Sequence, residues 1–260
     1  MRGIGSKLLA VSSIVLYTII WVPVIILIVF SFSQNKLGIK WEGFTIKWYP
    51  IIVHNTSVRH ALVTSLIVAS ITVVIATIAG TLTAYGLYKY KFRGKQTFRT
   101  ALLLPIVMPY VVVGGSLLVF FTRVLPISLG YPSIIIAHIS FSIPLAVFVV
   151  LGRMSRIDWT LEEASADLGA DKLTTWRKIT IPLLLPAIIA SAALIFPWSF
   201  DDFTITYFVA GVGTTTLPIY VFSQLRFGSS AVINCIGTIF VILPLAGLLL
   251  MTFLQRRETV

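Results

Sequence analysis

Residues 160–186 read TLEEASADLGADKLTTWRKITIPLLLP, a charged segment that lies between two apolar stretches. The other long segments of the chain carry almost no charge, so this one stands out as water-facing. Its charged side chains are Glu162, Glu163, Asp167, Asp171, Lys172, Arg177 and Lys178. The segment is therefore predicted to be an aqueous loop that joins two membrane-spanning helices.

The local pattern of this loop predicts two short helices. Thr160 followed by Glu163 is typical of a capping box, in which each side chain satisfies a free backbone N–H. Gly169 stands where a helix of this length would end in a left-handed residue, and Asp171 can cap a second helix. The expected order is a helix, a glycine bend, and a second helix running to Pro182.

Composition assigns the whole chain to a membrane protein. Of its 260 residues 57% are hydrophobic and 11% are charged, with a mean hydropathy of +0.98. Water-soluble domains are not built from such a composition. The formal net charge of +11 does not indicate nucleic-acid binding, because the basic residues cluster at the ends of apolar stretches. Cys235 is the only cysteine, which excludes a disulfide framework and a cysteine metal site.

Six transmembrane helices are predicted, in one all-α membrane fold. The first apolar run, residues 8–32, follows Arg2 and Lys7 but is too long for a cleaved signal peptide. Each further run is close to the roughly 20 residues that cross a bilayer. These runs cover residues 61–88, 100–122, 132–151, 183–208 and 231–254. The third span holds Pro105 and Pro109, and is expected to be kinked or interrupted.

Orientation follows from the distribution of lysine and arginine, which gather on the cytoplasmic side of membrane proteins. The richer side holds Arg2, Lys7, Lys89, Lys91, Arg93, Lys95, Arg99, Arg153, Arg156, Lys172, Arg177, Lys178, Arg256 and Arg257. The other side holds Lys36, Lys40, Lys47, Arg59, Arg123 and Arg226. Both termini and the loop at 160–182 are therefore predicted to be cytoplasmic.

With these spacings in place, the loop resembles the EAA loop of permease subunits in bacterial ABC importers. The matching residues are Glu163-Ala164-Ser165, Gly169-Ala170 and Ile179-Thr180-Ile181-Pro182. Ser165 and Ile181 depart from the usual alanine and leucine, with little change in size. The resemblance implies the type I importer fold and a coupling helix that docks on a cytoplasmic ATPase. The implied coupling residues are Glu162, Glu163, Ala164, Asp167, Gly169 and Ala170.

Other segments are similar to the second permease subunit of spermidine/putrescine importers. They are GIKWEGFTIKWYP, YKYKFRGK, residues 138–144 and SFDDF. The resemblance implies a sister permease, two ATPase subunits that bind ATP and Mg, and an extracytoplasmic substrate-binding protein, in a bacterial inner membrane. The expected organisation is a first helix and outer aromatic loop at 1–60, a permease core at 61–255 with its coupling loop at 153–182, and a tail at 256–260.

Asp201 and Asp202 are the acidic residues predicted to lie inside a span. A charged side chain in a bilayer costs several kcal/mol unless it faces a polar cavity or a partner, so both are candidates for a substrate pathway, with Trp198 and Phe203 beside them. Counted from residue 183, Asp201 lies roughly 27 Å along a helix, in the outer half of the bilayer. The alternative is structural: Pro197 breaks the helix and the run from Ser199 to Asp202 caps its restart.

Motifs for an enzyme are absent from the sequence. His54, His60 and His138 form no H-E-x-x-H zinc motif, and Gly94-Lys95 lacks the upstream glycine of a phosphate-binding loop. His138 is expected to be either a hydrogen-bonded structural residue or a functional one. The sequence thus predicts a transport subunit with no catalytic or metal site and no cofactor of its own. Open alternatives are import of another solute, or an ion-gradient-driven transporter or channel with Asp201 or Asp202 as the ion site.

Overall fold

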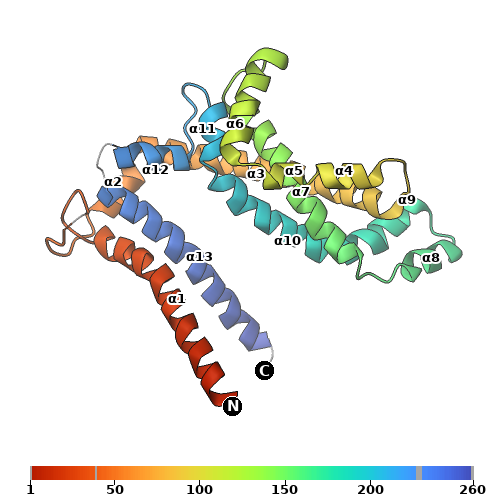
Figure 1. Cartoon of the computed structure of the whole chain (residues 1–260), viewed down its shortest axis with the longest axis horizontal. Helices are drawn as coiled ribbons and strands as arrows, with labels where there is room; N and C mark the ends of the chain where they lie inside the picture. Colours follow the sequence, from red (N-terminus) through yellow and green to blue (C-terminus); the bar gives the residue numbers. More distant parts are fainter. Residues whose placement is uncertain (1, 39, 227–229, 259–260) are drawn as a thin grey trace. The chain divides into compact units, whose positions relative to one another are not determined.

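The structure is a computed structural model that describes residues 2–38, 40–226 and 230–258. Over these residues it is helical, apart from loops and one isolated antiparallel bridge between Ser33 and Phe44. The elements, shown in Figure 1, are α1 (Arg2–Ser31), α2 (Trp48–His54), α3 (Thr56–Lys89), α4 (Lys95–Ala101), α5 (Leu104–Val107), α6 (Tyr110–Val119), η1 (Phe120–Val124), α7 (Tyr131–Met154), α8 (Thr160–Asp167), α9 (Lys172–Thr175), η2 (Trp176–Thr180), α10 (Ile181–Phe200), α11 (Thr204–Val209), α12 (Leu217–Arg226) and α13 (Ser230–Glu258).

Among the described residues, four helices are long and apolar enough to cross a membrane. The number of candidate spans rises to five if a bent pair of helices is counted as one span. The four spans are Leu9–Ser31, Thr56–Lys89, Tyr131–Met154 and Lys172–Phe200. The bent pair, Lys95–Val107 and Tyr110–Val124, turns by 103° at the break before Tyr110. Pro109 lies at that break with extended backbone, so the predicted interruption of the third span is confirmed. The predicted total of six is not reached among the described side chains, where the last apolar helix is the shorter Ala231–Leu243.

The predicted fifth span, 183–208, is wrong at its start. The helix begins at Lys172, because a π-helical turn, η2, joins α9 to α10 without a break. The second loop helix therefore does not end at Pro182. That proline is the second residue of α10 and lies inside the continuous helix, directly after the π-helical turn, where the backbone hydrogen-bond pattern changes.

The same span is also wrong at its far end. Helix α10 ends at Phe200, and Asp201 has the backbone angles φ −94° and ψ 0° of a helix terminus. A separate helix, α11, then follows. Pro197 lies inside α10, so the break expected at Pro197 falls a turn later.

The chain divides into two compact units, which we describe separately. The first unit comprises Met1–Arg59 and Tyr220–Val260. In it α1 lies beside α13 (Figure 1), and Gly237 of α13 lets the side chain of Leu27 approach its backbone. Cys235 donates from Sγ to the carbonyl oxygen of Ser31, at 3.2 Å.

The second unit, His60–Ile219, contains the coupling loop and both aspartates. Its centre is the packing of α3 and α10 against α7. A Cβ added to Gly80 of α3 would lie 2.4 Å from Cβ of Ala146 in α7, so only glycine permits this approach. Ala76 and Ala84 on the same stripe are fully buried. The stripe of small residues on α3 therefore packs within this chain.

Candidate coupling and substrate sites

Helix α8 begins differently from the prediction. The carboxylate of Asp158 accepts hydrogen bonds from the hydroxyl and the backbone N–H of Thr160, at 2.8 and 3.1 Å. These bonds lower the pKa of Asp158. Trp159 already has helical backbone angles, so Thr160 lies inside the helix and cannot act as its cap. The predicted capping box of Thr160 and Glu163 is wrong, and Glu163 is exposed.

The end of α8 agrees with the prediction. Gly169 has a φ of +82°, in the left-handed region. Its N–H donates to the carbonyl of Ala166 at 2.9 Å, and the N–H of Ala170 donates to the carbonyl of Ser165 at 3.1 Å. This pair of bonds is a Schellman motif, which satisfies the free carbonyls at a helix end.

The predicted cap of the second loop helix is also confirmed. Asp171, in extended backbone conformation, accepts a hydrogen bond from the backbone N–H of Thr174 at 3.3 Å. The interaction with Thr174 lowers the pKa of Asp171. Two successive helix boundaries are therefore set by residues within the loop itself.

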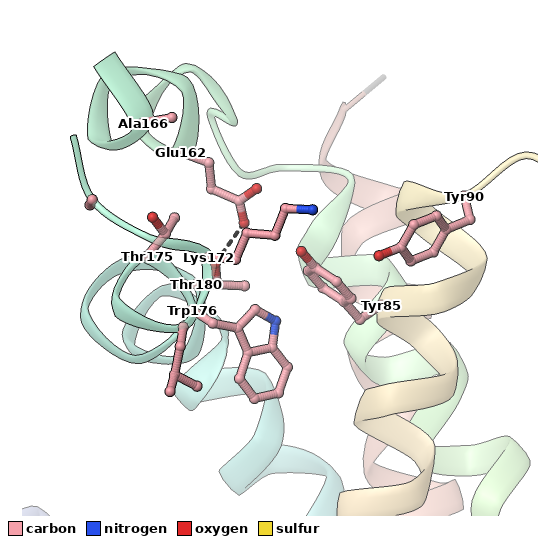
Figure 2. A pocket seen from close by; sticks show the side chains of 10 residues that line it. Tyr85, Tyr90, Glu162, Ala166, Lys172, Thr175, Trp176 and Thr180 are labelled. Atoms are coloured by element: carbon pink, nitrogen blue, oxygen red, sulfur yellow. Dashed lines mark hydrogen bonds between the residues drawn. The ribbon is translucent and has the colours of Figure 1, made fainter. Parts of the chain in front are cut away.

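Glu162 connects α8 to two other helices. One oxygen of its carboxylate lies 2.6 Å from Nζ of Lys89, the last residue of α3. The other oxygen accepts a hydrogen bond, also at 2.6 Å, from the hydroxyl of Thr180 at the end of η2. Figure 2 shows this second bond as a dashed line from Glu162 to Thr180. Nearby, the hydroxyls of Ser165 and Thr175 bond to each other at 3.0 Å.

Aromatic rings also make contacts between the end of α3 and the loop. The ammonium group of Lys89 lies 4.0 Å from the centroid of the Trp159 ring, a cation–π contact. Tyr88 packs against Trp159 with ring centroids 5.1 Å apart. About one turn earlier in α3, Tyr85 packs edge to face against Trp176 of η2, with ring centroids 5.8 Å apart.

A cavity of about 550 Å³ lies between the end of α3 and the loop. Figure 2 shows Tyr85 and Tyr90 on one side of it, and Glu162, Thr180 and Trp176 on the other. Its lining residues are Tyr85, Tyr90, Glu162, Ala166, Ala170, Lys172, Leu173, Thr175, Trp176 and Thr180.

The predicted coupling residues fall on different faces of this segment. Glu163, Ala164, Asp167 and Gly169 are exposed, Ala170 is half-buried, and the side chain of Glu162 is 15% exposed and turned inward. The exposed face also carries leucines that the sequence reasoning missed. Leu168 is 89% exposed, and Leu161 and Leu173 are exposed as well. Apolar side chains in an otherwise charged loop were a usable signal for a contact surface.

The two aspartates occupy different environments. Asp202 is buried, and its carboxylate accepts hydrogen bonds from the backbone N–H and the hydroxyl of Thr206 at 2.8 and 2.9 Å. A longer bond of 3.4 Å comes from the N–H of Ile205. Asp202 therefore caps the start of α11. The structural alternative, in which the run from Ser199 to Asp202 caps a restarted helix, is thus correct for Asp202. Ser199 does not take part in that cap.

His138 of α7 completes this buried cluster. Its Nδ1 lies 2.7 Å from the hydroxyl of Ser199, and its Nε2 lies 2.9 Å from the hydroxyl of Thr206 and 3.4 Å from Asp202. Because the Thr206 hydroxyl donates its hydrogen to Asp202, it must accept from Nε2–H of His138. The end of α10, the start of α11 and the middle of α7 are thus joined through one imidazole.

Asp201 is exposed at the end of α10, three residues after Trp198 and two before Phe203 in the sequence. The Trp198 ring is 40% exposed and meets Tyr110 of α6 edge to face at 6.1 Å. Phe203 is half-buried and packs against Tyr207 at 5.4 Å. An exposed carboxylate with exposed aromatic rings is suited to an organic cation. Sequence reasoning missed Tyr110, which no local pattern connects with the aspartates.

No group of three or more histidine, cysteine, aspartate or glutamate side chains that could hold a metal ion occurs within residues 2–38, 40–226 and 230–258.

Comparison with known proteins identifies the family. Residues 73–259 match the model of the binding-protein-dependent transport system inner membrane component. The chain belongs to this family. It is 37% identical to the spermidine/putrescine transport system permease protein PotC of Haemophilus influenzae, over 94% of this chain and 95% of that protein. It is 36% identical to the putrescine transport system permease protein PotI of Escherichia coli, over 86% and 82% of the two chains.

The fold also matches a solved structure. A bacterial ABC transporter involved in the import of the acidic polysaccharide alginate aligns over 98% of both chains, with a TM-score of 0.72 and 16% identity. The resemblance of this chain to ABC importer permeases is confirmed, as is the all-helical permease fold, whereas the predicted six spans and cytoplasmic termini stay predictions.

Proposed function

We propose that this chain is the permease subunit of an ATP-driven, binding-protein-dependent importer of polyamines in a bacterial inner membrane. The observation that carries the proposal is its 36–38% identity, over most of each chain, to permeases of spermidine/putrescine and putrescine systems. The chemistry around Asp201 supports this substrate. An exposed carboxylate, one helical turn from the exposed ring of Trp198, attracts an organic cation and repels an anion.

The coupling loop supports a cytoplasmic ATPase as partner. Its outer face combines carboxylates with exposed leucines such as Leu168, a mixture that suits a protein contact surface. The complete importer would contain this chain, a sister permease, two ATPase subunits that bind ATP and Mg, and an extracytoplasmic substrate-binding protein. The alginate importer, a structural relative, forms a complex with a periplasmic protein bound to an alginate pentasaccharide.

A single continuous helix connects the two sites. The span Lys172–Phe200 has 29 residues, which is roughly 43 Å at 1.5 Å per residue. It begins in the coupling loop and ends next to Asp201. ATP-driven closure of the ATPase subunits would displace the loop and so tilt the helix that ends at Asp201, the carboxylate proposed to attract the substrate. This is the motion that alternating access requires.

The test of this function is competition for uptake by the assembled importer. We expect excess unlabelled spermidine and putrescine to block uptake of labelled spermidine, and amino acids and anions to leave it unchanged. Competition by another solute alone would show an importer of that solute. Uptake that continues without ATP and stops when an ion gradient collapses would show the gradient-driven alternative.

The proposed topology has six spans, with both termini and α8 in the cytoplasm. The exposed residues Lys36 and Lys91 lie on opposite sides in this arrangement. We expect an impermeant maleimide to label Lys36→Cys in sealed right-side-out vesicles, and Lys91→Cys only after permeabilisation, because lysine and arginine concentrate on the cytoplasmic side. The background is Cys235→Ala, which removes the native thiol. The reverse labelling pattern would overturn the topology and the cytoplasmic position of α8.

A further inference from the structure

Two neighbouring glutamates on α8 face in different directions. Glu163 is exposed, as is Asp167 one turn later on the same side of the helix. Glu162 points inward with a side chain only 15% exposed, and both of its carboxylate oxygens are bonded. Adjacent residues on a helix point about 100° apart, so Glu162 and Glu163 contact different surroundings.

The inward contacts reach two membrane spans, α3 at its last residue and the span Lys172–Phe200 where η2 meets α10. Lys89 ends α3, and its ammonium group lies 2.6 Å from Glu162. Thr180 immediately precedes α10, and its hydroxyl also lies 2.6 Å from Glu162. Lys89 additionally lies over the ring of Trp159, the residue just before α8. The start of α8 is therefore held to α3 and α10 at one carboxylate.

A cavity beside Glu162 separates part of the loop from α3. Figure 2 shows Tyr85 and Tyr90 on one side of it and Ala166 on the loop side; Ala170 and Leu173 of the loop also line it. Across this space the loop and α3 meet at the edge-to-face pair of Tyr85 and Trp176, and their attachment depends on such individual contacts. One of them is the charged Lys89–Glu162 pair, which is largely buried, with side chains 26% and 15% exposed. A largely buried ion pair is screened less by water and salt than an exposed one.

We propose that Glu162 is a positioning residue that transmits the displacement of α8 to α3 and α10, whereas Glu163 belongs to the surface that meets the ATPase. This inference rests on the proposed function as an ATP-driven importer. Glu162 touches neither substrate nor nucleotide. Its role is to make the loop and the two spans move together.

The experiment compares Glu162→Gln with the matched variant Glu163→Gln in the assembled complex. Three quantities are measured in lipid nanodiscs or vesicles: ATPase association, ATP hydrolysis, and ATP hydrolysed per polyamine imported. We expect Glu162→Gln to retain association but to raise the ATP hydrolysed per polyamine by about fivefold or more, the range of typical coupling free energies. Glu163→Gln should instead weaken association, with less change in that ratio.

A double variant tests the pair itself. In the Glu162→Gln background, Lys89→Gln should add less than its effect in the wild-type chain, because the interaction is already lost. A purely structural role would lower abundance and melting temperature without changing the ATP-to-substrate ratio of the remaining complex. A wild-type ratio in Glu162→Gln, or a loss of association equal to that of Glu163→Gln, would overturn the proposal. If the wild-type chain binds no ATPase at all, the proposed function fails instead.

Discussion

Replacing Gly169 with valine should leave the chain in the membrane but lower ATPase association and transport together. Gly169 has a φ of +82° and carries the Schellman motif that ends α8. A left-handed backbone costs a non-glycine residue roughly 1–2 kcal/mol, and a β-branched side chain is at the unfavourable end. A Cβ at this position would meet no atom within 4 Å, so the effect is one of backbone conformation alone. We expect transport to fall by about tenfold.

Gly94 provides a matched control for this variant. It has a φ of +85°, lies in the loop between α3 and α4, and would also have open space around an added Cβ. Gly94→Val therefore imposes the same backbone strain outside the coupling loop. Binding of the purified ATPase and uptake are measured for both variants at equal abundance. Equal losses in the two variants, or wild-type transport by Gly169→Val, would contradict a coupling role for the bend after α8.

The outcome for Gly169 and Asp171 shows what local sequence can predict. A left-handed helix end and a helix cap depend on residues within a few positions, so their identity and spacing carry the information. The prediction for the start of α8 failed on the same local scale, because Asp158 and Thr160 are both residue types that cap helices well and lie two positions apart. The sequence offered no means of ranking them. In the structure Thr160 is the first residue of the helix, and its N–H donates to the carboxylate of Asp158.

The inward contacts could not be found from the sequence. Lys89 and Glu162 lie 73 positions apart, and His138 lies 61 and 68 positions from its partners Ser199 and Thr206. Such pairs depend on how α3, α7 and α10 pack, and nothing in the local pattern of either partner specifies the other. The prediction of the membrane spans succeeded for the runs 8–32, 61–88 and 132–151, each of which matches a helix long enough to cross a membrane. It failed at 183–208, where a π-helical turn and a cap set the boundaries instead of hydropathy.

The second large effect concerns the two aspartates, for which the structure predicts different defects. Asp202 is buried in the cluster with His138 and Thr206, and the bonds that it accepts from Thr206 fix the start of α11. Asp202→Asn retains one acceptor oxygen but replaces the other with a donor, which conflicts with the donors already present. Hydrogen bonds to a charged group contribute about 1.5–3 kcal/mol each. We therefore expect lower thermal stability and lower abundance, with little change in the KM of the complex that remains.

Asp201→Asn should give the opposite result. Its carboxylate is exposed at the end of α10, so the neutral amide keeps the size of the side chain and leaves packing unchanged. If this charge attracts a polyamine, its loss should raise the KM for spermidine by about tenfold, equivalent to about 1.4 kcal/mol of interaction with one ammonium group. Asp201→Glu keeps the charge and should restore most of the uptake. The measurements are spermidine and putrescine uptake across a concentration series, with melting temperature and abundance for each variant.

The pair of results separates charge from structure in a way that either variant alone cannot. A stable Asp201→Asn with raised KM, beside an unstable Asp202→Asn with normal KM, would place the substrate charge on the exposed aspartate. Unchanged uptake by Asp201→Asn would remove the charge-based role, and the assignment to polyamines would then rest on family membership. A raised KM in Asp202→Asn at full stability would require the buried cluster to open during transport. In that case His138, which joins α7 to both helices, would lie at the moving part of the pathway.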